Sequence, residues 1–511
     1  MLPPVPVPPD RARHYVNQRL WDDRTLADGI ESAARTHPDR TAVVDNRRSL
    51  SFAELADAVA AGVRQIRRSG VAAGEPVMLV CGNSIEGVVA YHSLLRIGAV
   101  AVVLDRRCGP ADLVAAYDAT DPRLSIVAAS LGASLLAAGL PGRQLPLEEL
   151  GVPASRDVEP QWSEPDRDGV AAVMFTSGTT SRPKAVTHSI NTLTAGARNM
   201  ALATGSGSEA VIFLVSPLTS ITGIMQMHMA ADLHAALVLE DAFDPAGALD
   251  RLNQERATLI GGAPVIVERL LAAADAGPDR RLTLRVVALG GSMLPRSLLD
   301  RVTDEYGVTV ARVYGSSEAP NSTGSMPDDS SEMRLADDGA PLPGTEVRVG
   351  SSSHAQECLL RGPNLFLGYL DPVDNAGAFE DGWFRTGDLV ELSAQGRLTV
   401  LGRLKEVVDR NGLKISLAEI DAALEGAPGI EECASFARPD PVTGERLAVA
   451  VRPSGNVSPT LAELGQYLQL KGLAKRKFPE ELVVWDGPLP RTASGKVIRS
   501  RLTSEATGKM H

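Results

Sequence analysis

One stretch of the chain combines the groups that can hold a polyphosphate. Residues 173–186 read VMFTSGTTSRPKAV, a short apolar strand followed by a loop with five hydroxyl side chains, one glycine and one lysine, Lys184. Hydroxyls, free backbone N–H groups and an ammonium are the donors that such a loop needs. The chain contains no Walker A pattern. Composition alone also suits a serine- and threonine-rich surface turn, so both interpretations stay open at this point.

Lys184 stands out because lysine is rare in this chain. Of 51 basic residues only eight are lysines, and no other lysine occurs before residue 401. A GC-rich genome that favours arginine codons explains the bulk composition. The 63 acidic residues give a net charge of −12, which disfavours a broad surface for nucleic acid or acidic lipid. An anionic ligand must therefore be held by local groups.

The cysteines and histidines do not indicate a metal site. Cys81, Cys108, Cys358 and Cys433 lie far apart and form no C-x-x-C pair, and the eight histidines show no ligand spacing. The first residues lack a basic segment followed by an apolar one, and no run approaches about 18 apolar residues. We expect a cytoplasmic protein without a signal peptide, membrane span or nucleic-acid partner.

An α/β fold is expected to position these groups. Short β-branched runs at residues 76–80, 99–104, 211–215 and 284–289 alternate with stretches rich in alanine, leucine and arginine. Alternation of this kind predicts parallel sheets that are covered by helices. The Pro-rich first nine residues are interpreted as a loose tail.

The charge distribution changes after Arg403. Residues 404–511 hold 15 basic and 14 acidic groups and seven of the eight lysines, whereas residues 1–403 are strongly acidic. We predict a large N-terminal α/β domain with several sheets over residues 1–403. A small, mobile α+β lid domain is predicted over residues 404–511.

Five further motifs follow the loop in order. YGSSE ends at Glu318, GAPLPG at Gly344 and GWFRTGD at Asp388; a glycine and Arg403 precede GLKISLAEI, and PRTASGK ends at Lys496. Together with the hydroxyl-rich loop, they resemble the motifs of the adenylate-forming superfamily, in the same order and over nearly the whole chain. The chain is identified as a member of this superfamily, which includes acyl-CoA synthetases, nonribosomal adenylation domains and luciferases.

The resemblance implies a two-step reaction. A carboxylate attacks the α-phosphate of ATP and releases pyrophosphate, and a thiol then attacks the acyl-adenylate and releases AMP. The implied cofactors are ATP, Mg²⁺ and coenzyme A. Because both steps join like-charged groups, the protein must neutralise charge and orient the partners.

The resemblance also assigns roles to residues that match the family motifs. Glu318 would bind Mg²⁺ as a hard oxygen ligand, and Asp388 would accept from the ribose hydroxyls. Lys496 would bridge the acid carboxylate and the α-phosphate; with Glu318 and Ser317 it forms the predicted catalytic set. The other nucleotide-binding predictions are Thr176, Ser177, Gly178, Thr179, Thr180 and Lys184 at the β- and γ-phosphates, Ser317 at the α-phosphate, Gly291, Ser292 and Tyr314 around adenine, Gly315 and Ser316 beside the nucleotide, and Arg403 at ribose or phosphate.

The family's lid rotates about a hinge, here Lys405, so that one site serves both steps. Rotation would withdraw Lys496 and bring the Gly412 loop to the pantetheine tunnel. A basic cluster is assigned to the CoA 3′-phosphate, although a solvated surface explains it equally well. It comprises Lys471, Lys475, Arg476 and Lys477.

Two departures fall in the phosphate loop. Ser181 and Ala185 replace glycines of the family pattern, at points where the backbone could approach phosphate or adopt positive φ. We expect a functional loop because both residues are small. The alternative is an enzyme that adenylates poorly and only transfers a supplied acyl-adenylate to CoA.

A third departure falls in the segment SPLTSITG at residues 216–223. Acyl-CoA synthetases commonly have an aromatic residue and a histidine where Thr219 and Ser220 stand, so the gate here is small. This favours a bulky acid, alicyclic or polycyclic, although neighbouring side chains could equally fill the space. Gly223 and Met227 are also assigned to the acyl pocket, with core packing as the alternative for Met227. The segment has no acidic residue to pair with an amino-acid ammonium.

These observations predict an ATP-dependent acyl-CoA ligase. Residues 20–26, LWDDRTL, are similar to the cyclohexanecarboxylate and medium-chain type of CoA ligase. The arginine-rich composition indicates an actinobacterial type of source, in which such enzymes serve natural-product biosynthesis. An adenylating enzyme that loads a carrier protein and a silent nucleotide-binding protein are the alternatives. The sequence is compatible with a homodimer.

Overall fold

The computed structural model divides into two units. One comprises Met1–Gly291, Asp300–Val347 and Leu360–Phe384, and the other Ser292–Leu299, Arg348–Leu359 and Arg385–His511. The described residues are 4–22, 26–129, 131, 142–151, 165–176, 183–277, 282–290, 294, 296–404, 406–410, 413–440, 444–455, 458–491 and 496–506. The predicted boundary after residue 403 stays a prediction, because each unit is assembled from several segments.

A six-stranded sheet of the first unit carries the stem of the hydroxyl-rich loop. Its order is β6 (Arg143–Pro146), β5 (Leu124–Val127), β3 (Pro76–Cys81), β4 (Val100–Asp105), β7 (Ala172–Thr176) and β8 (Lys184–His188). All neighbours are parallel except the antiparallel pair β7 and β8. The valine-rich strands β3 and β4 are almost entirely buried, as parallel strands covered on both faces are.

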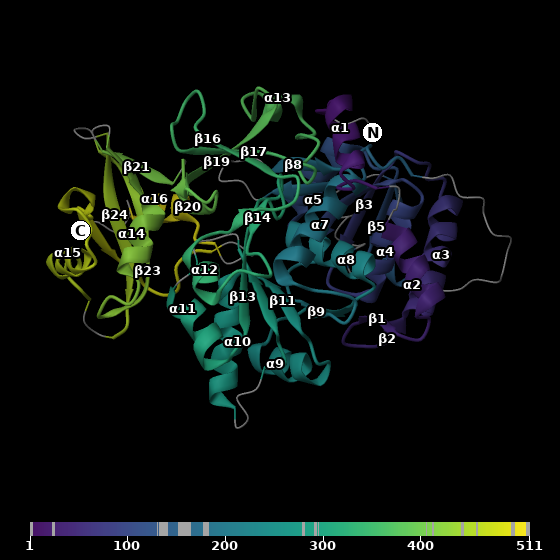
Figure 1. Ribbon diagram of the computed structural model, residues 1–511, viewed down its shortest axis with the longest axis horizontal. Coiled ribbons are helices and arrows are strands. Elements are labelled where there is room, and N and C mark those ends of the chain that lie inside the picture. Colours follow the sequence, from purple (N-terminus) through teal and green to yellow (C-terminus); the bar gives the residue numbers. More distant parts are fainter. Residues whose placement is uncertain are drawn as a thin grey trace. The chain divides into compact units, whose positions relative to one another are not determined.

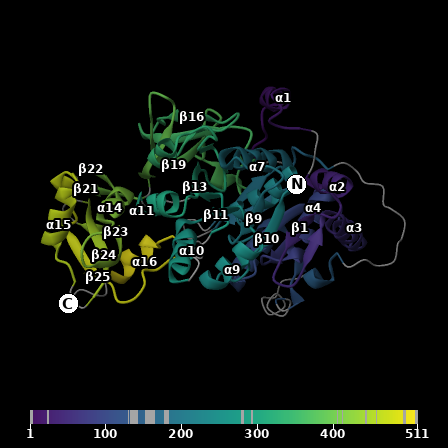
Figure 2. The ribbon, with the colours of Figure 1, turned by 60° about the horizontal axis from the view of Figure 1, so that its bottom comes forward.

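A nine-stranded sheet forms the rest of the framework. Its order is β15 (Ala340–Pro341), β14 (Thr323–Gly324), β13 (Thr309–Tyr314), β12 (Val286–Leu289), β11 (Leu259–Gly262), β9 (Val211–Leu214), β10 (Ala236–Leu239), β1 (Thr41–Val44) and β2 (Ser49–Ser51). The strands from β13 to β1 run parallel, whereas β2, β14 and β15 are antiparallel to their neighbours. Figure 2 shows β13, β11, β9, β10 and β1 following one another across this sheet.

Helices precede and connect these strands along the chain. They are α1 (Pro9–Asn17), α2 (Leu26–Thr36), α3 (Phe52–Arg68), α4 (Ile85–Arg96), α5 (Pro110–Thr120), α7 (Ile190–Thr204), α8 (Ile221–Leu233), α9 (Pro245–Gln254), α10 (Pro264–Ala276), α11 (Arg296–Asp300), α12 (Ser331–Ala336) and α13 (Pro372–Asn375). The neighbouring helices α7 and α8 (Figure 1) and the fully buried α4 share one core cluster with strands of both sheets. Ser84, Ser189 and Ser220 are the N-cap residues of α4, α7 and α8. Each side chain accepts a hydrogen bond from the backbone N–H three residues later.

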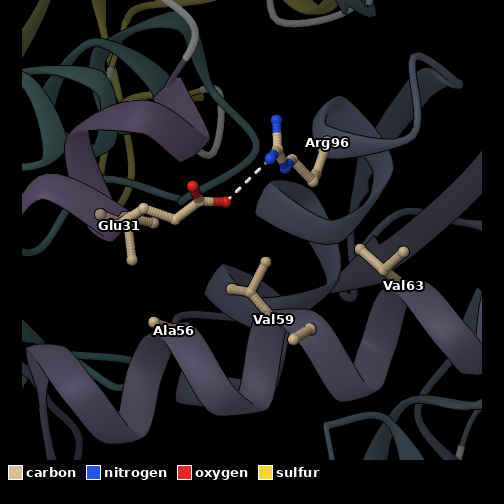
Figure 3. Close-up of a pocket in the computed structure, with 7 residues that line it drawn as sticks. Glu31, Ala56, Val59, Val63 and Arg96 are labelled. Atoms are coloured by element: carbon tan, nitrogen blue, oxygen red, sulfur yellow. Dashed lines mark ion pairs between the residues drawn. The ribbon is translucent and has the colours of Figure 1, made fainter. Parts of the chain in front are cut away.

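A small cavity lies between α2, α3 and α4. It is lined by apolar side chains such as Val59 and Val63, and an ion pair between Glu31 and Arg96 with a 3.0 Å N–O distance spans it (Figure 3). Its volume of about 30 Å³ exceeds the roughly 10–15 Å³ that one water molecule needs and is far too small for an acid or a nucleotide.

Two smaller sheets complete the fold. One contains β16 (Glu346–Val349), β17 (Glu357–Arg361), β19 (Trp383–Leu392) and β18 (Phe379–Glu380), with β20 (Leu398–Arg403) paired to β19. The other lies wholly in the second unit and contains β22 (Leu413–Ser416), β21 (Val407–Arg410), β24 (Gly444–Pro453), β23 (Ile430–Asp440) and β25 (Glu481–Val484), with α14 (Leu417–Leu424), α15 (Leu461–Leu470) and α16 (Arg499–Ala506). The predicted multi-sheet α/β domain with a smaller α+β domain is confirmed. Within the described ranges, no helix has the length and apolarity to cross a membrane.

Candidate active site

Strands β7 and β8 form the stem of the predicted phosphate loop. Thr176, the last residue of β7, pairs with Lys184, the first residue of β8, and the Thr176 hydroxyl donates to the Lys184 carbonyl oxygen over 3.5 Å. The stem therefore holds the Lys184 backbone directly beside the loop. The predicted loop residues outside the described ranges are Ser177, Gly178, Thr179, Thr180 and Ser181.

Ala185 occupies an ordinary strand position. It pairs with Phe175 across the stem, and its carbonyl oxygen accepts a 2.8 Å hydrogen bond from the Leu370 N–H. Ala185 is 7% exposed and belongs to a core cluster with Val173. The backbone at this departure from the family pattern therefore does not need glycine.

Four side chains meet at the start of β8. The Lys184 ammonium lies 4.4 Å from the centre of the Tyr369 ring, a cation–π distance, and 3.8 Å from Oδ1 of Asp374. The Tyr369 hydroxyl donates a 2.8 Å hydrogen bond to Oε1 of Glu318. Burial and the Glu318 carboxylate raise the pKa of Tyr369, so this hydroxyl keeps its proton. A cation and a carboxylate from distant motifs are thus joined through one buried ring.

Backbone pairing brings these distant segments together. Residues 366–370 lie along β8, where the Leu367 N–H donates to the Thr187 carbonyl and the Thr187 N–H to the Gly368 carbonyl. The Phe366 N–H donates over 2.7 Å to the Glu318 carbonyl. The segment therefore ties the loop after β13 to the stem of the phosphate loop.

His188 binds the loop that follows β13. Its Nε2 lies 2.7 Å from the Ser317 carbonyl oxygen, and its Nδ1 lies 3.0 Å from the Thr192 hydroxyl. A carbonyl can only accept, so Nε2 carries the proton. Burial lowers the pKa of His188 to about 4, and the ring is neutral at pH 7. The histidine is therefore a fixed donor that positions the Ser317 carbonyl.

The motif after β13 forms a tight turn. The Ser322 N–H donates to the Tyr314 carbonyl, and the Glu318 N–H donates to the Ser316 hydroxyl over 3.2 Å. A Cβ atom at Gly315 would lie 2.6 Å from the Ala319 carbonyl oxygen, so only glycine fits. Tyr314 is 9% exposed. The predicted adenine neighbours Gly291 and Ser292 lie outside the described residues.

Asp388 and Arg403 form a pair in the second unit. They are register partners on β19 and β20, and Nε of Arg403 lies 2.9 Å from Oδ1 of Asp388. The Asp388 side chain is 6% exposed, whereas that of Arg403 is 47% exposed. The Asp388 N–H donates to the Thr386 hydroxyl, which donates to the Cys358 carbonyl. These contacts hold the Asp388 carboxylate, which the family resemblance assigns to the ribose hydroxyls.

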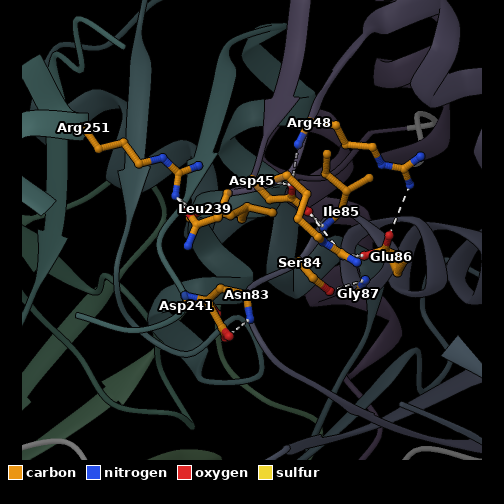
Figure 4. A network of polar contacts seen from close by, with 12 residues as sticks. Asp45, Arg48, Asn83, Ser84, Ile85, Glu86, Gly87, Leu239, Asp241 and Arg251 are labelled. Carbon is orange, nitrogen blue, oxygen red and sulfur yellow. Dashed lines mark hydrogen bonds and ion pairs between the residues drawn. The ribbon is translucent and has the colours of Figure 1, made fainter. Parts of the chain in front are cut away.

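Asn83 holds the segment that is predicted to gate the acid. It follows β3, and its Nδ2 donates to the Ser216 carbonyl over 3.0 Å and to the Glu240 carbonyl over 2.8 Å. Its Oδ1 accepts from the Leu218 N–H over 2.7 Å, and its own N–H donates to Asp241. Figure 4 shows Asn83 beside Asp241 in a network of polar contacts that also includes Asp45 and Glu86.

The predicted pocket residues begin α8. Ser220 uses its hydroxyl to cap the helix, donating to the Pro217 carbonyl and accepting from the Gly223 N–H. A Cβ atom at Gly223 would lie 2.3 Å from the Pro217 carbonyl oxygen, so the turn requires glycine. Thr219 is buried, and Met227 is 1% exposed within the core cluster. Their assignment to an acyl pocket stays a prediction.

The predicted lid residues differ in their surroundings. Lys496, Lys471, Lys475 and Arg476 are exposed. Lys477 instead pairs with Glu419 at an N–O distance of 2.5 Å, so its charge is partly neutralised within the unit. Lys405 and Gly412 lie outside the described residues.

Comparison with known families decides the family of this chain. The model of the AMP-binding enzyme family matches residues 30–370, and that of the AMP-binding enzyme C-terminal domain matches residues 419–496. The chain belongs to the AMP-binding enzyme family. The predicted membership of the adenylate-forming superfamily is thereby confirmed.

Relatives of this AMP-binding enzyme are similar over nearly their whole length. Medium-chain fatty-acid–CoA ligase from Escherichia coli is 31% identical over 95% of this chain and 91% of its own. 2-Succinylbenzoate–CoA ligase from Geobacillus kaustophilus is 30% identical over 94% and 97%. Salicylyl-CoA synthase / salicylate adenylyltransferase from a Streptomyces species is 28% identical over 99% and 98%.

Solved structures agree with the fold and the chemistry. The o-succinylbenzoate CoA synthetase MenE from Bacillus subtilis, in complex with its acyl-adenylate intermediate, superposes with a TM-score of 0.83 at 25% identity, over 94% of this chain and 98% of MenE. Its complex with ATP and magnesium gives 0.82 at 26% identity, over 93% and 98%. The predicted class, an AMP-forming acid–thiol ligase that uses ATP and Mg²⁺, is confirmed.

Sequence reasoning missed three supporting residues of this AMP-binding enzyme. His188 was dismissed with the other histidines because it lacks ligand spacing, although it ends the strand that begins at Lys184. Tyr369 lies outside the motifs we considered. Asn83 follows a valine-rich parallel strand, and this position at the carboxyl end of β3 was the available signal.

Proposed function

We propose that this AMP-binding enzyme converts a bulky apolar carboxylic acid, alicyclic or polycyclic, into its CoA thioester in the cytoplasm. The observation that carries the choice of acid is the gate segment, where Thr219 and Ser220 are small and no residue from 216 to 223 is acidic. An amino-acid ammonium would have no partner in this segment. The relative named for medium-chain fatty acids supports an apolar acid, and the relative named for 2-succinylbenzoate supports an acid that contains a ring.

The phosphate end of the site fits ATP. Lys184 and the donors of the β7–β8 loop would hold the β- and γ-phosphates, since the stem places this lysine beside the loop. Mg²⁺ held by Glu318 would neutralise charge between phosphate oxygens. Tyr369 donates to one Glu318 oxygen and thereby fixes the carboxylate for the metal. Asp388 would accept from the ribose hydroxyls.

Lys496 would act in the first step, as the family resemblance implies. An oxygen of the acid carboxylate attacks the α-phosphorus, the bond to the pyrophosphate oxygen breaks, and the ammonium offsets the charge of both groups. In the second step, the CoA sulfur attacks the acyl carbon, AMP leaves, and the thiol proton passes to solvent.

The first experiment compares two routes to the thioester. A panel of apolar acids is supplied either with ATP, Mg²⁺ and CoA or as synthetic acyl-adenylates with CoA, and the thioesters are measured by mass spectrometry. We expect product by both routes. Product from the adenylates alone would contradict adenylation and leave the alternative of a transferase with a weakened phosphate loop. Labelling of a carrier protein in place of CoA would contradict the acceptor.

A gate variant tests the size of the acid. Thr219→Phe fills the predicted space, whereas Thr219→Ser keeps the position small and serves as the matched control. We expect Thr219→Phe to lower the ratio of kcat/KM for a polycyclic acid to that for a short linear acid by about tenfold, the effect of about 1.4 kcal/mol of lost packing. An unchanged ratio would contradict the assignment of Thr219 to the acid pocket.

A further inference from the structure

Described residues on the two sides of the predicted Lys496 loop form a short stem. Arg491 and Val497 form an isolated antiparallel bridge, and the Ile498 N–H donates to the Pro490 carbonyl over 2.8 Å. The two sides of the stem therefore meet immediately before the loop and immediately after Lys496. Whatever holds this stem also sets where the exposed Lys496 ammonium can reach.

Glu432 on β23 holds the first side of the stem. Its Oε2 accepts from the Leu489 N–H over 3.1 Å, and its Oε1 accepts from Nε of Arg491 over 3.0 Å. One carboxylate thus binds both a backbone and a side-chain donor on the segment that leads into the loop. Because β23 is paired with β24 along almost its whole length, this anchor is rigid.

Arg499 holds the second side. It begins α16, three residues after Lys496, and all three guanidinium nitrogens have partners on other elements. One terminal nitrogen lies 2.6 Å from Oδ2 of Asp421 on α14, the other lies 3.1 Å from Oε2 of Glu406, and Nε donates to the Ser435 carbonyl on β23 over 3.0 Å. The Asp421 carboxylate also accepts from the Ser435 N–H. The Arg499 guanidinium therefore binds two groups, Asp421 and Ser435, that already hold each other in place.

We propose that Arg499 is a positioning residue for Lys496 in the adenylation step. Three residues of chain span at most about 10 Å, so releasing the guanidinium frees the base of the lysine loop. The three contacts use the planar fork of arginine, which a lysine cannot reproduce. Glu406 directly follows the predicted hinge residue and directly precedes β21. The Arg499 guanidinium therefore links the Lys496 segment to the start of β21.

The inference rests on the role of Lys496 in the proposed function. A purely structural ion pair would predict that loss of Arg499 weakens the whole unit and lowers both half-reactions together. Positioning of Lys496 predicts a selective loss, because the supplied acyl-adenylate has already passed the step that uses this lysine. The two half-reactions therefore separate the two explanations.

The test uses the full-length enzyme and four changes. Arg499→Met removes all three contacts, Arg499→Lys keeps the charge without the fork, and Lys496→Ala removes the ammonium. Arg438→Met is the matched control, since Arg438 is a partly buried arginine of β23, 12% exposed against 21% for Arg499, and it pairs with Glu481 of β25. Adenylation is measured as acid-dependent exchange of pyrophosphate into ATP, and the second step as thioester formation from a synthetic adenylate.

We expect both Arg499 variants to lower the exchange rate about 10- to 100-fold, the cost of a misplaced catalytic group, and to lower thioester formation less than threefold. In the Lys496→Ala background, Arg499→Lys should cause no further loss of exchange. Arg438→Met should leave the exchange rate within threefold.

Three results would overturn the proposal. Equal losses in the two half-reactions would make Arg499 a structural residue only, and a full additional loss in the Lys496→Ala background would show that it acts independently of Lys496. Unchanged exchange in Lys496→Ala alone would remove the assigned role of that lysine, and with it both the proposed mechanism and this inference. If Arg499→Met does not fold, Arg499→Lys supplies the same comparison.

Discussion

The buried histidine beneath the Ser317 loop makes the stability of this enzyme depend on pH. Burial lowers the pKa of His188 from its ordinary value to about 4, whereas the same side chain in the unfolded chain has a pKa of about 6.5. Below that value the unfolded state binds more protons than the folded state. The contribution of His188 therefore falls as the pH falls through the window from about 6.5 to about 4.

The size of the effect follows from the two pKa values. In the unfolded chain this histidine goes from about one quarter protonated at pH 7 to almost fully protonated at pH 5, whereas in the folded chain it stays almost unprotonated, which lowers the free energy of unfolding by about 2 kcal/mol. His92 and His228 are also buried with lowered pKa values and add losses of the same sign. Only a comparison of variants isolates the share of His188.

His188→Gln supplies that comparison. The glutamine amide can donate to the Ser317 carbonyl and accept from Thr192 but does not titrate. We expect urea denaturation to show a loss between pH 7 and pH 5 that is about 2 kcal/mol smaller in this variant than in the parent enzyme. His37→Gln, at an exposed histidine, is the control and should leave the loss unchanged. An equal loss in parent and His188→Gln would refute the assignment of a neutral, buried His188.

Three further substitutions test the supports of the site. Tyr369→Phe removes the hydroxyl that donates to Glu318. We expect the half-saturating Mg²⁺ concentration in pyrophosphate exchange to rise about tenfold, equivalent to about 1.4 kcal/mol. An unchanged Mg²⁺ requirement would contradict this link. Asn83→Ala removes the hydrogen bonds that hold the gate segment. The KM for the acid should rise about tenfold, while the KM for ATP stays within twofold. Parallel changes in both constants would contradict a gate-specific role. Ala185→Gly should lower the stability by about 1 kcal/mol without raising the exchange rate, because the position is a buried strand residue; a fivefold gain in exchange would show that the loop needs the glycine.

The sequence predicted the fold class and the family. Lys184 and Glu318 belong to motifs more than a hundred residues apart, and the structure brings both side chains to Tyr369. These two residues could be predicted from the motifs because a phosphate site requires a cation and a magnesium site requires a carboxylate. The two-unit division was expected from the change in charge, although the segments that make up each unit could not be read from composition.

The supporting residues could not be predicted in the same way. A buried amide such as Asn83 or a neutral imidazole such as His188 has no characteristic spacing, because its partners are backbone carbonyls that every residue possesses. The concern over Ala185 had a similar origin. A glycine in a family pattern suggests positive φ, yet pairing with Phe175 makes this position regular strand, and only the hydrogen-bond register reveals that.

One device recurs at each part of the candidate site. A buried or partly buried side chain on one segment binds the backbone of another: His188 binds the Ser317 carbonyl, Asn83 binds the Ser216 carbonyl, and Arg499 binds the Ser435 carbonyl. Such a contact positions the backbone that carries a neighbouring functional side chain, and the supporting residue itself does not contact the ligand. It leaves a signature that differs from that of a ligand contact, since its loss misplaces one group and affects one step or one substrate. Selective defects in Mg²⁺ requirement, acid KM or adenylation are therefore the expected phenotypes of these supports, whereas loss of Lys496 itself should cause the largest fall in the rate of the first step.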